Sequence, residues 1–261
     1  MTSYKTILLE QKNENYVIVT LNRPEELNAL SRDMREELVS CFQSLESMPD
    51  LKAVILTGGD FTFSTGADIK EISSLRETEV EIYFDSLHTC LRQIIFFPRP
   101  VIAAVSGIAI GGGLNLAVSC DLIVASETAI FGHPELKFGM NPLIGPLQRR
   151  IGIAKAKEIA LLGEPIPAHE ALRIGLINRV AAPERLMEEV EDMAKEISQR
   201  SAKAIEVVKK VSATIPQMDL NSALAMEFEM SSFLFTRSER KNYMRDFFLA
   251  EEMRKRKSRL E

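Results

Sequence analysis

Short apolar runs alternate with amphipathic segments through the first part of the chain. Four runs have the length and the β-branched content of buried strands: Tyr16–Leu21, Ala53–Leu56, Val101–Val105 and Leu122–Ala125. Between them, two longer segments repeat apolar residues at helical spacing, over Arg32–Glu46 and Glu77–Phe96. Strands that alternate with helices predict an α/β fold built from crossover units, rather than from hairpins, with helices covering a sheet.

From about Pro183 the pattern changes to long, charged segments with helical periodicity. Four helices are expected, over 186–200, 202–215, 222–235 and 239–255, and Pro216 separates the second from the third. The third and fourth carry more apolar surface than a lone helical layer can easily hide, so a subunit interface and an internal core are both open. We expect a core over residues 1–195 and a C-terminal helical region over 196–261.

The composition is that of an ordinary globular protein, with 46% hydrophobic and 26% charged residues. A net charge of −5 gives no electrostatic reason to expect nucleic acid, and the dense basic run Arg254–Lys257 is typical of a solvated helix end. The uncharged stretch Val101–Cys120 is better described as a strand, a glycine turn and a helix start than as a membrane span. Neither nucleic acid nor a membrane is therefore expected as a partner.

The three cysteines, Cys41, Cys90 and Cys120, have no paired spacing and no neighbouring histidines, which indicates neither a disulfide framework nor a zinc site. The first residues, MTSYKTILLEQ, contain no apolar core of signal-peptide length. We therefore expect a reducing compartment, with the cytoplasm as the location.

Two glycine-containing turns each follow a strand-like run and precede a helix start, in FTFSTGADIKEI (61–72) and SGIAIGGGLNLA (106–117). Neither contains the phosphate-binding GxxxxGK[ST] or GxGxxG pattern. A turn into a helix presents unpaired backbone N–H groups beside the positive end of the helix dipole. Two such turns aimed at one oxygen would stabilise a carbonyl oxygen that gains negative charge, whereas glycines that merely permit tight turns are the alternative.

Six segments, in one order across most of the chain, resemble the enoyl-CoA hydratase/isomerase family, also called the crotonase superfamily. They are LNRPEELNAL (21–30), FSTGADIKEI (63–72), GIAIGGGLNLAVSCDLIVAS (107–126), FGHPELKFG (131–139), ALRIGLINRV (171–180) and SERKNYMRDF (238–247). The resemblance implies a crotonase-like core of stacked ββα units that binds acyl-CoA. It also implies that the C-terminal helices pack homotrimers, often paired into homohexamers.

The resemblance further implies that two backbone N–H groups, here those of Ala67 and Gly112, hold the thioester oxygen of the substrate. Residues Ala67 to Lys70, which include Asp68 and Ile69, would line the CoA channel. The loop around Glu26 and Leu27 would lie along the pantetheine or nucleotide portion. Because CoA is part of the substrate, neither a separate cofactor nor a metal is expected.

The proton chemistry depends on one departure from the family pattern. In the hydratases of the family two glutamates hold the water, and the second matches Glu135, but the first corresponds to Asn115, which cannot exchange a proton at neutral pH. Moving a double bond from 3-enoyl-CoA to 2-enoyl-CoA needs only one carboxylate, so isomerisation through an enolate is the first hypothesis. Hydration or dehydration is the alternative, and a catalytically inactive CoA-binding or assembly protein is a third. Asn115 is a candidate for contact with water or substrate, and His133 for tuning Glu135 or contacting substrate.

A second departure lies just beyond Glu135. The family often has a glycine-rich run there, whereas this chain has MNPLIGPLQRR (140–150). Pro142 and Pro146 stiffen the segment and remove two backbone donors, which predicts a reshaped acyl pocket and leaves the acyl group open.

Overall fold

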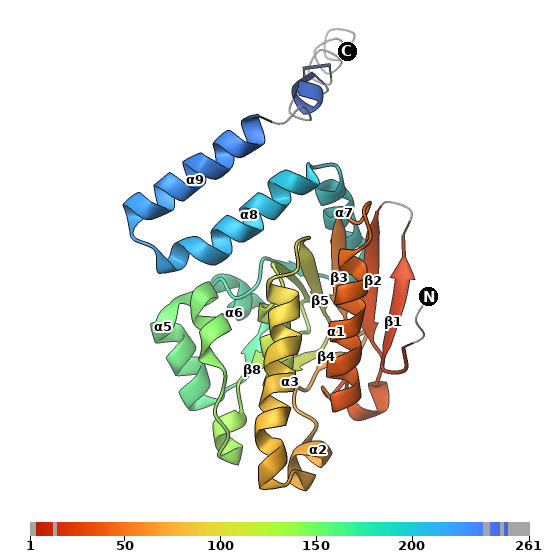
Figure 1. Ribbon diagram of the computed structural model, residues 1–261. Coiled ribbons are helices and arrows are strands. Elements are labelled where there is room, and N and C mark those ends of the chain that lie inside the picture. The colour runs from red at the N-terminus through yellow and green to blue at the C-terminus, as the bar shows by residue number, and fades with distance from the viewer. Residues whose placement is uncertain (1–3, 13–14, 237–240, 246–247, 250–261) are drawn as a thin grey trace. The chain divides into compact units, whose positions relative to one another are not determined.

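The computed structural model describes residues 4–12, 15–236, 241–245 and 248–249, and the chain divides into two compact units between Arg200 and Ser201 (Figure 1). The first unit contains two sheets and the second contains helices. Among the described residues no helix is both long and apolar enough to cross a membrane.

The larger sheet of the first unit has six strands, in the order β1-β2-β3-β5-β7-β10. Their bounds are β1 Ile7–Gln11, β2 Tyr16–Leu21, β3 Ala53–Thr57, β5 Val101–Val105, β7 Leu122–Ser126 and β10 Arg179–Ala181. The four expected strands are confirmed, and β3 and β7 each extend one residue further. All neighbours are parallel except β1, which pairs antiparallel with β2. The expectation of crossover units without hairpins was therefore wrong at β1, where a short chain reversal joins two neighbouring strands.

The smaller sheet holds the turns that carry the candidate site. Its order is β4-β6-β8-β9, with β4 Thr62–Ser64, β6 Ile108–Ile110, β8 Ile130–Gly132 and β9 Ile166–Pro167. Each of the first three follows shortly after a strand of the larger sheet and leads toward a helix, so the chain repeats a strand–strand–helix unit. Because β4 and β6 are parallel neighbours, the turns that follow them lie at the same edge.

Helices bury both faces of the larger sheet. α1 (Arg32–Glu46) and α3 (Glu77–Ile95) lie on one face in Figure 1, and both were expected. On β2 and β3, Val17, Val19, Val54 and Leu56 belong to this core, whereas the residues that alternate with them pack with α7 (Leu186–Ser198) on the other face. Burial on both faces explains the continuous apolar runs of these strands.

The first unit has four further helices. They are α2 Ile69–Ser74, α4 Gly112–Val118, α5 Ile144–Leu162 and α6 Ala168–Arg173. Of these, α2 and α4 follow the two glycine turns, and α5 follows the segment after Glu135. α5 is interrupted at Gly152, whose φ of 75° is not helical. Short 3-10 helices add η1 Pro24–Glu26, η2 Glu135–Phe138 and η3 Pro183–Arg185. Cys41, Cys90 and Cys120 are buried and form no disulfide, and burial raises the pKa of Cys41 and of Cys90 to about 12.

The second unit contains α8 (Ala202–Thr214), η4 (Ile215–Gln217) and α9 (Leu220–Phe235). α9 begins two residues before the expected Ser222 because the Asp219 side chain accepts hydrogen bonds from the N–H groups of Asn221 and Ser222 and caps the helix. The helix expected over 239–255 lies largely outside the described residues. Phe228 and Phe235 of α9 are 71% and 63% exposed. The oligomerisation role of this region stays a prediction.

Candidate active site

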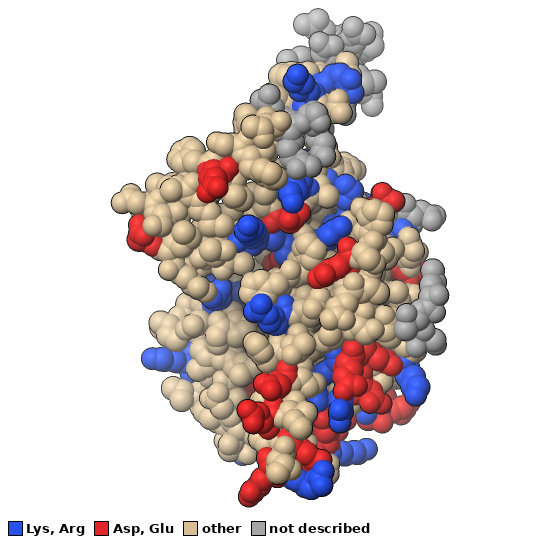
Figure 2. Space-filling model, in the orientation of Figure 1, with Lys and Arg blue, Asp and Glu red and all other residues tan. Residues whose placement is uncertain are grey.

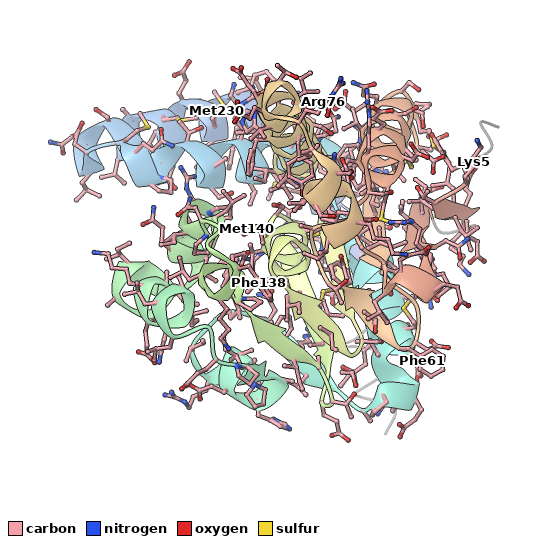
Figure 3. All side chains as sticks on the ribbon, turned by 90° about the horizontal axis from the view of Figure 1, so that it is seen from below. Lys5, Phe61, Arg76, Phe138, Met140 and Met230 are labelled. Carbon is pink, nitrogen blue, oxygen red and sulfur yellow. The ribbon has the colours of Figure 1, made fainter. Side chains whose placement is uncertain are left out.

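A cavity of about 290 Å³ in the first unit brings together four of the residues expected at the site. Ala67 and Gly112 line it from the two glycine turns, Asn115 from α4, and Glu135 from the start of η2. The remaining wall is mainly apolar: Leu30, Ile72, Tyr83, Phe84, Leu87, Gly139, Met140, Asn141 and Leu143. Figure 3 shows Phe138 and Met140 on the segment that joins β8 to α5, and Met140 belongs to the cavity wall.

The amide of Ala67 is oriented by the peptide group to which it belongs. The carbonyl oxygen of that peptide, on Gly66, accepts a hydrogen bond of 2.7 Å from the N–H of Leu30. In a trans peptide the C=O and N–H point in opposite directions, so this bond turns the Ala67 N–H away from Leu30. Within the described part of the chain, that N–H donates no hydrogen bond. It is therefore available to a ligand.

The amide of Gly112 is oriented by a helix. Gly112 is the first residue of α4, where an N–H has no intrahelical acceptor and meets the positive end of the dipole. The oxygen of its peptide, on Gly111, accepts a 3.0 Å hydrogen bond from the N–H of Asn115. Hydrogen bonding at each peptide oxygen polarises the amide and strengthens its N–H as a donor.

The two turns touch backbone to backbone. A Cβ added to Gly66 would lie 2.5 Å from the Gly112 nitrogen, and one added to Gly112 would lie 3.4 Å from the Ala67 nitrogen. Gly66 also has a φ of +87°, so it has both a steric and a conformational reason to be glycine. The two free N–H groups consequently lie side by side at the cavity wall, where they can bind one oxygen.

Asn28 and Ser64 hold the first turn, and the sequence analysis missed both. The Asn28 Nδ2 donates to the carbonyl oxygens of Gly58 and Thr62, both at 2.9 Å. The Ser64 Oγ donates to the Asn28 carbonyl oxygen at 2.7 Å and accepts from the Gly66 N–H at 3.1 Å. Asn28 has a φ of 53°, a left-handed conformation that asparagine tolerates better than most residues. Its place in the LNAL string was the available signal.

Arg35 was also missed, although it is only 1% exposed. Its guanidinium donates to the Leu30 carbonyl oxygen at 2.6 Å and to Glu71 at 2.7 Å, and it lies 4.5 Å from the centre of the Tyr83 ring. It therefore ties α1 to α2, to α3 and to the residue that orients the Ala67 peptide. A charge at helical spacing from Leu38 and Phe42, on the apolar face of α1, was the sequence signal.

The expected CoA-channel residues Asp68, Ile69 and Lys70 follow Ala67 directly but do not line the cavity. Asp68 caps α2 and pairs with Arg23 at 3.0 Å. Burial raises the pKa of its carboxyl, but the hydrogen bonds from Arg23 and from the first amides of α2 outweigh burial and hold that pKa below its ordinary value. Ile69 and Lys70 are exposed, as is Leu27. Substrate contacts of these residues stay predictions.

Glu135 and His133 form a pair. The two carboxylate oxygens of Glu135 lie 2.9 and 3.0 Å from His133 Nδ1, and the Glu135 side chain is 14% exposed. With a proton on Nδ1, His133 donates to the carboxylate and fixes its orientation. The histidine is fully buried and does not line the cavity, so its position favours tuning Glu135 over contact with substrate. A Cβ at Gly111 would lie 3.3 Å from Glu135 Oε1, which places the carboxylate beside the start of α4.

Asn115 places its side-chain amide at the cavity wall. The residue is 1% exposed, and its Oδ1 is buried without a hydrogen bond among the described residues. The amide can accept or donate a hydrogen bond but cannot carry a proton away. The cavity thus combines two backbone N–H donors, one carboxylate and the neutral side-chain amides of Asn115 and Asn141.

Comparison with known proteins identifies the family of the chain. The profile of the family described as enoyl-CoA hydratase/isomerase matches residues 11–257. A short-chain-enoyl-CoA hydratase of Clostridium acetobutylicum is 36% identical over 245 residues, which cover 92% of this chain and 94% of that protein. A crotonyl-CoA hydratase of Syntrophomonas wolfei is 34% identical over 249 residues, covering 94% and 95%.

A solved structure shows the same fold. The enoyl-CoA hydratase from Bacillus anthracis superimposes with a TM-score of 0.91 at 30% identity, over 94% of this chain and 97% of that one. The expected crotonase-like fold is therefore confirmed. The chain belongs to the enoyl-CoA hydratase/isomerase family and is an enzyme of that type.

Proposed function

We propose that the protein catalyses the reversible hydration of 2-enoyl-CoA thioesters. The observation that carries the proposal is Asn115 on the wall of the cavity that holds Glu135, because its buried Oδ1 has no hydrogen-bond partner among the described residues. A buried polar group without a partner is costly, so the site is complete only when something hydrogen-bonds to it. Isomerisation moves protons between carbon atoms and brings no O–H group to this amide, whereas hydration brings a water. The similarity to proteins named as enoyl-CoA and crotonyl-CoA hydratases supports the same choice.

In the proposed reaction the N–H groups of Ala67 and Gly112 bind the thioester oxygen, and Asn115 and Glu135 hold a water. The carboxylate of Glu135 takes a proton from the water while the water oxygen forms a bond to C3. The electron pair of the C2=C3 bond moves toward the thioester, giving an enolate whose oxygen the two amides stabilise. Glu135 then returns its proton to C2, which yields the 3-hydroxyacyl-CoA and restores the carboxylate. The scheme uses no cofactor beyond the CoA of the substrate.

The magnitudes are adequate for a site with only one acid. A single oxyanion donor is worth about 3 to 4 kcal/mol of transition-state stabilisation, and proton transfer by a positioned side chain contributes about 10² to 10⁴ in rate. Because His133 orients the carboxylate and the two amides are preorganised, the missing second carboxylate costs the site a proton donor but not its means of stabilising charge.

Isomerisation of 3-enoyl-CoA is the second candidate, because it needs one carboxylate, and Glu135 is the one that lines the cavity among the described residues. The test is to incubate the protein separately with 2-enoyl-CoA and 3-enoyl-CoA and to separate the products chromatographically. We expect 3-hydroxyacyl-CoA from the former at the higher kcat/KM. Rapid formation of 2-enoyl-CoA from the latter, with no hydroxyacyl product from either substrate, would overturn the proposal in favour of isomerisation.

Two variants sharpen the test. Asn115→Leu keeps a similar volume and removes the amide, so hydration should fall by about 10² or less, while exchange of the C2 hydrogens of butyryl-CoA with D2O should continue. Glu135→Gln should abolish both. Absence of C2 exchange in the unaltered protein would instead favour the inactive CoA-binding alternative.

A further inference from the structure

A second, larger cavity of about 580 Å³ adjoins the first. Four residues line both cavities: Phe84, Leu87, Asn141 and Leu143. The second cavity is open to the surface along the segment between α3 and the start of α5, where Figure 2 shows mainly uncharged surface. All of its lining residues belong to the first unit.

The walls of this second cavity are apolar. Leu87, Leu91 and Ile95 form one wall at helical spacing along α3, and Pro142, Ile144 and Pro146 belong to the facing wall. The polar side chains among the lining residues are His88, Arg92 and Asn141, and Arg92 lies over the Phe96 ring at 4.8 Å from its centre. The exposed fractions of Phe84 and Phe96, 54% and 58%, show that large apolar groups remain uncovered there.

The position of the reacting atoms determines what can enter this space. The thioester oxygen at Ala67 and Gly112 and the proton-transfer group at Glu135 locate the reacting carbons in the first cavity. The two cavities meet at Phe84, Leu87 and Leu143, none of which belongs to the turns that hold the thioester. Atoms of the acyl chain beyond the reacting carbons can therefore continue into the second cavity, while the CoA portion leaves past the turns.

We propose that the second cavity binds the distal part of the acyl group, and that the preferred substrates are 2-enoyl-CoA thioesters with apolar chains longer than crotonyl. The inference rests on the proposed function. Pro142 and Pro146 restrict the backbone of one wall, so less conformational freedom is lost when a chain binds. This preference differs from the short-chain and crotonyl substrates for which the two relatives are named.

Binding of saturated thioesters tests the proposal without requiring any chemistry. Calorimetric titration with butyryl-CoA and octanoyl-CoA compares two ligands that differ only in chain length. Octanoyl-CoA should bind more tightly by about tenfold to a hundredfold, because each buried methylene contributes to affinity. Equal affinities, or tighter binding of butyryl-CoA, would overturn the proposal.

Gly145 offers a way to fill the cavity without disturbing the fold. It lines the second cavity and not the first, it lies in the first turn of α5, and a Cβ there meets no atom within 4 Å. Gly145→Trp should weaken octanoyl-CoA by about tenfold or more and leave butyryl-CoA within about twofold. The matched control is Gln148→Trp, which adds the same side chain at an exposed position of α5 outside the cavity. Ile95→Trp fills the cavity from the facing wall and should reproduce the selective loss.

The remaining outcomes separate this proposal from the proposed function. If Gly145→Trp weakens both ligands equally, or changes the oligomeric mass in light scattering and leaves both affinities intact, the cavity is not an acyl site. If octanoyl-CoA binds selectively but no 2-enoyl-CoA is hydrated, the acyl site holds and hydration fails. Hydration of crotonyl-CoA faster than of 2-octenoyl-CoA, with no chain-length effect on binding, would leave the reaction intact and remove the chain-length preference.

Discussion

The two turns that carry Ala67 and Gly112 reach the same cavity by different constructions. Polar side chains from distant parts of the sequence hold the first turn, and the helix that follows it, α2, has no buried residue. The second turn is held by close backbone packing, and α4 is buried along nearly its whole length and contains no charged residue. One amide is therefore oriented by a network of side-chain hydrogen bonds, and the other by the start of a helix that packs closely against the first turn.

This difference teaches where each turn is sensitive to substitution. A turn held by a network can lose one hydrogen bond and keep most of its shape, since net contributions of single bonds are modest. A turn held by close backbone packing is sensitive wherever an added Cβ would overlap backbone atoms, as at Gly113, because the packed backbone cannot yield without a shift of the helix. We expect substitutions to lower the catalytic rate most in the packed second turn, less in the buried network that holds the first turn, and least on the exposed face of α2.

Gly113→Ala should have the largest effect on rate. A Cβ at Gly113 would overlap the Ser64 carbonyl oxygen, so α4 must move away from β4. We expect kcat to fall by about 10² or more through misplacement of one oxyanion donor, and stability to fall by about 1 to 3 kcal/mol. Gly112→Ala is the matched variant. Its added Cβ would lie 3.3 Å from the nearest atom, the Gly66 Cα, so its loss of stability should be smaller. Initial rates and thermal unfolding check both, and equal losses of stability in the two variants would contradict the packing argument.

Arg35→Met should come second. The substitution removes the side-chain donor to the Leu30 carbonyl oxygen and the cation that pairs with Glu71, whose carboxylate keeps only the Arg32 N–H. We therefore expect the unfolding free energy to fall by about 3 kcal/mol and kcat by about tenfold. Replacing Glu71 as well, in Arg35→Met/Glu71→Leu, removes the unpaired charge and should restore part of the stability but not the rate. Urea unfolding and kcat measured on both variants make the comparison. Full recovery of rate in the double variant would show that Arg35 does not act through Leu30.

Asp68→Asn should have a smaller effect that depends on pH. Because the folded-state pKa of Asp68 is depressed, its ionised form stabilises the fold above the ordinary value of 3.8, and that contribution is lost as pH falls through the lower folded-state pKa. Asparagine also caps helices, so the variant loses mainly the pair with Arg23, at a cost of about 1 kcal/mol at neutral pH. Urea unfolding should show a lower unfolding free energy for the variant than for the unaltered protein at pH about 7, and little difference between them at pH about 2. Arg23→Gln should give the same pH dependence, and a loss independent of pH would refute the assignment.

The elements that follow from local patterns could be predicted from the sequence, and those that depend on distant partners could not. Continuous apolar runs predicted β2, β3, β5 and β7 to within one residue, because strands buried on both faces consist almost entirely of apolar residues. β1 was missed, since only Ile7 of its five residues is buried and its strand conformation depends on pairing with β2.

The candidate site divides in the same way. The two turns were found from their glycines between a strand and a helix start, and Glu135 from the resemblance to the family, and the structure brings them to one cavity. Asn28 and Arg35 act through carbonyl oxygens of other segments, which no local pattern specifies. The second cavity depends on the separation between α3 and the start of α5, and only the prolines of the 140–150 segment pointed toward it.

Lys70→Ala should have the smallest effect and tests the exposed side of the first turn. Lys70 lies on α2 close after Ala67, is exposed, and belongs to the residues expected to line the CoA channel, where its ammonium group could pair with a CoA phosphate. An exposed ion pair is worth about 1 kcal/mol or less, so KM for an acyl-CoA should be about threefold higher in the variant than in the unaltered protein at low salt. This difference should disappear at high salt, where screening weakens the pair in the unaltered protein. The N-acetylcysteamine thioester lacks the nucleotide phosphates and should show no change, and Lys157→Ala, an exposed lysine of α5, should leave KM unaltered for both substrates. An equal rise in KM for the thioester without phosphates would mean that Lys70 supports the turn itself, and the helix after the first turn would then be as structural as the helix after the second.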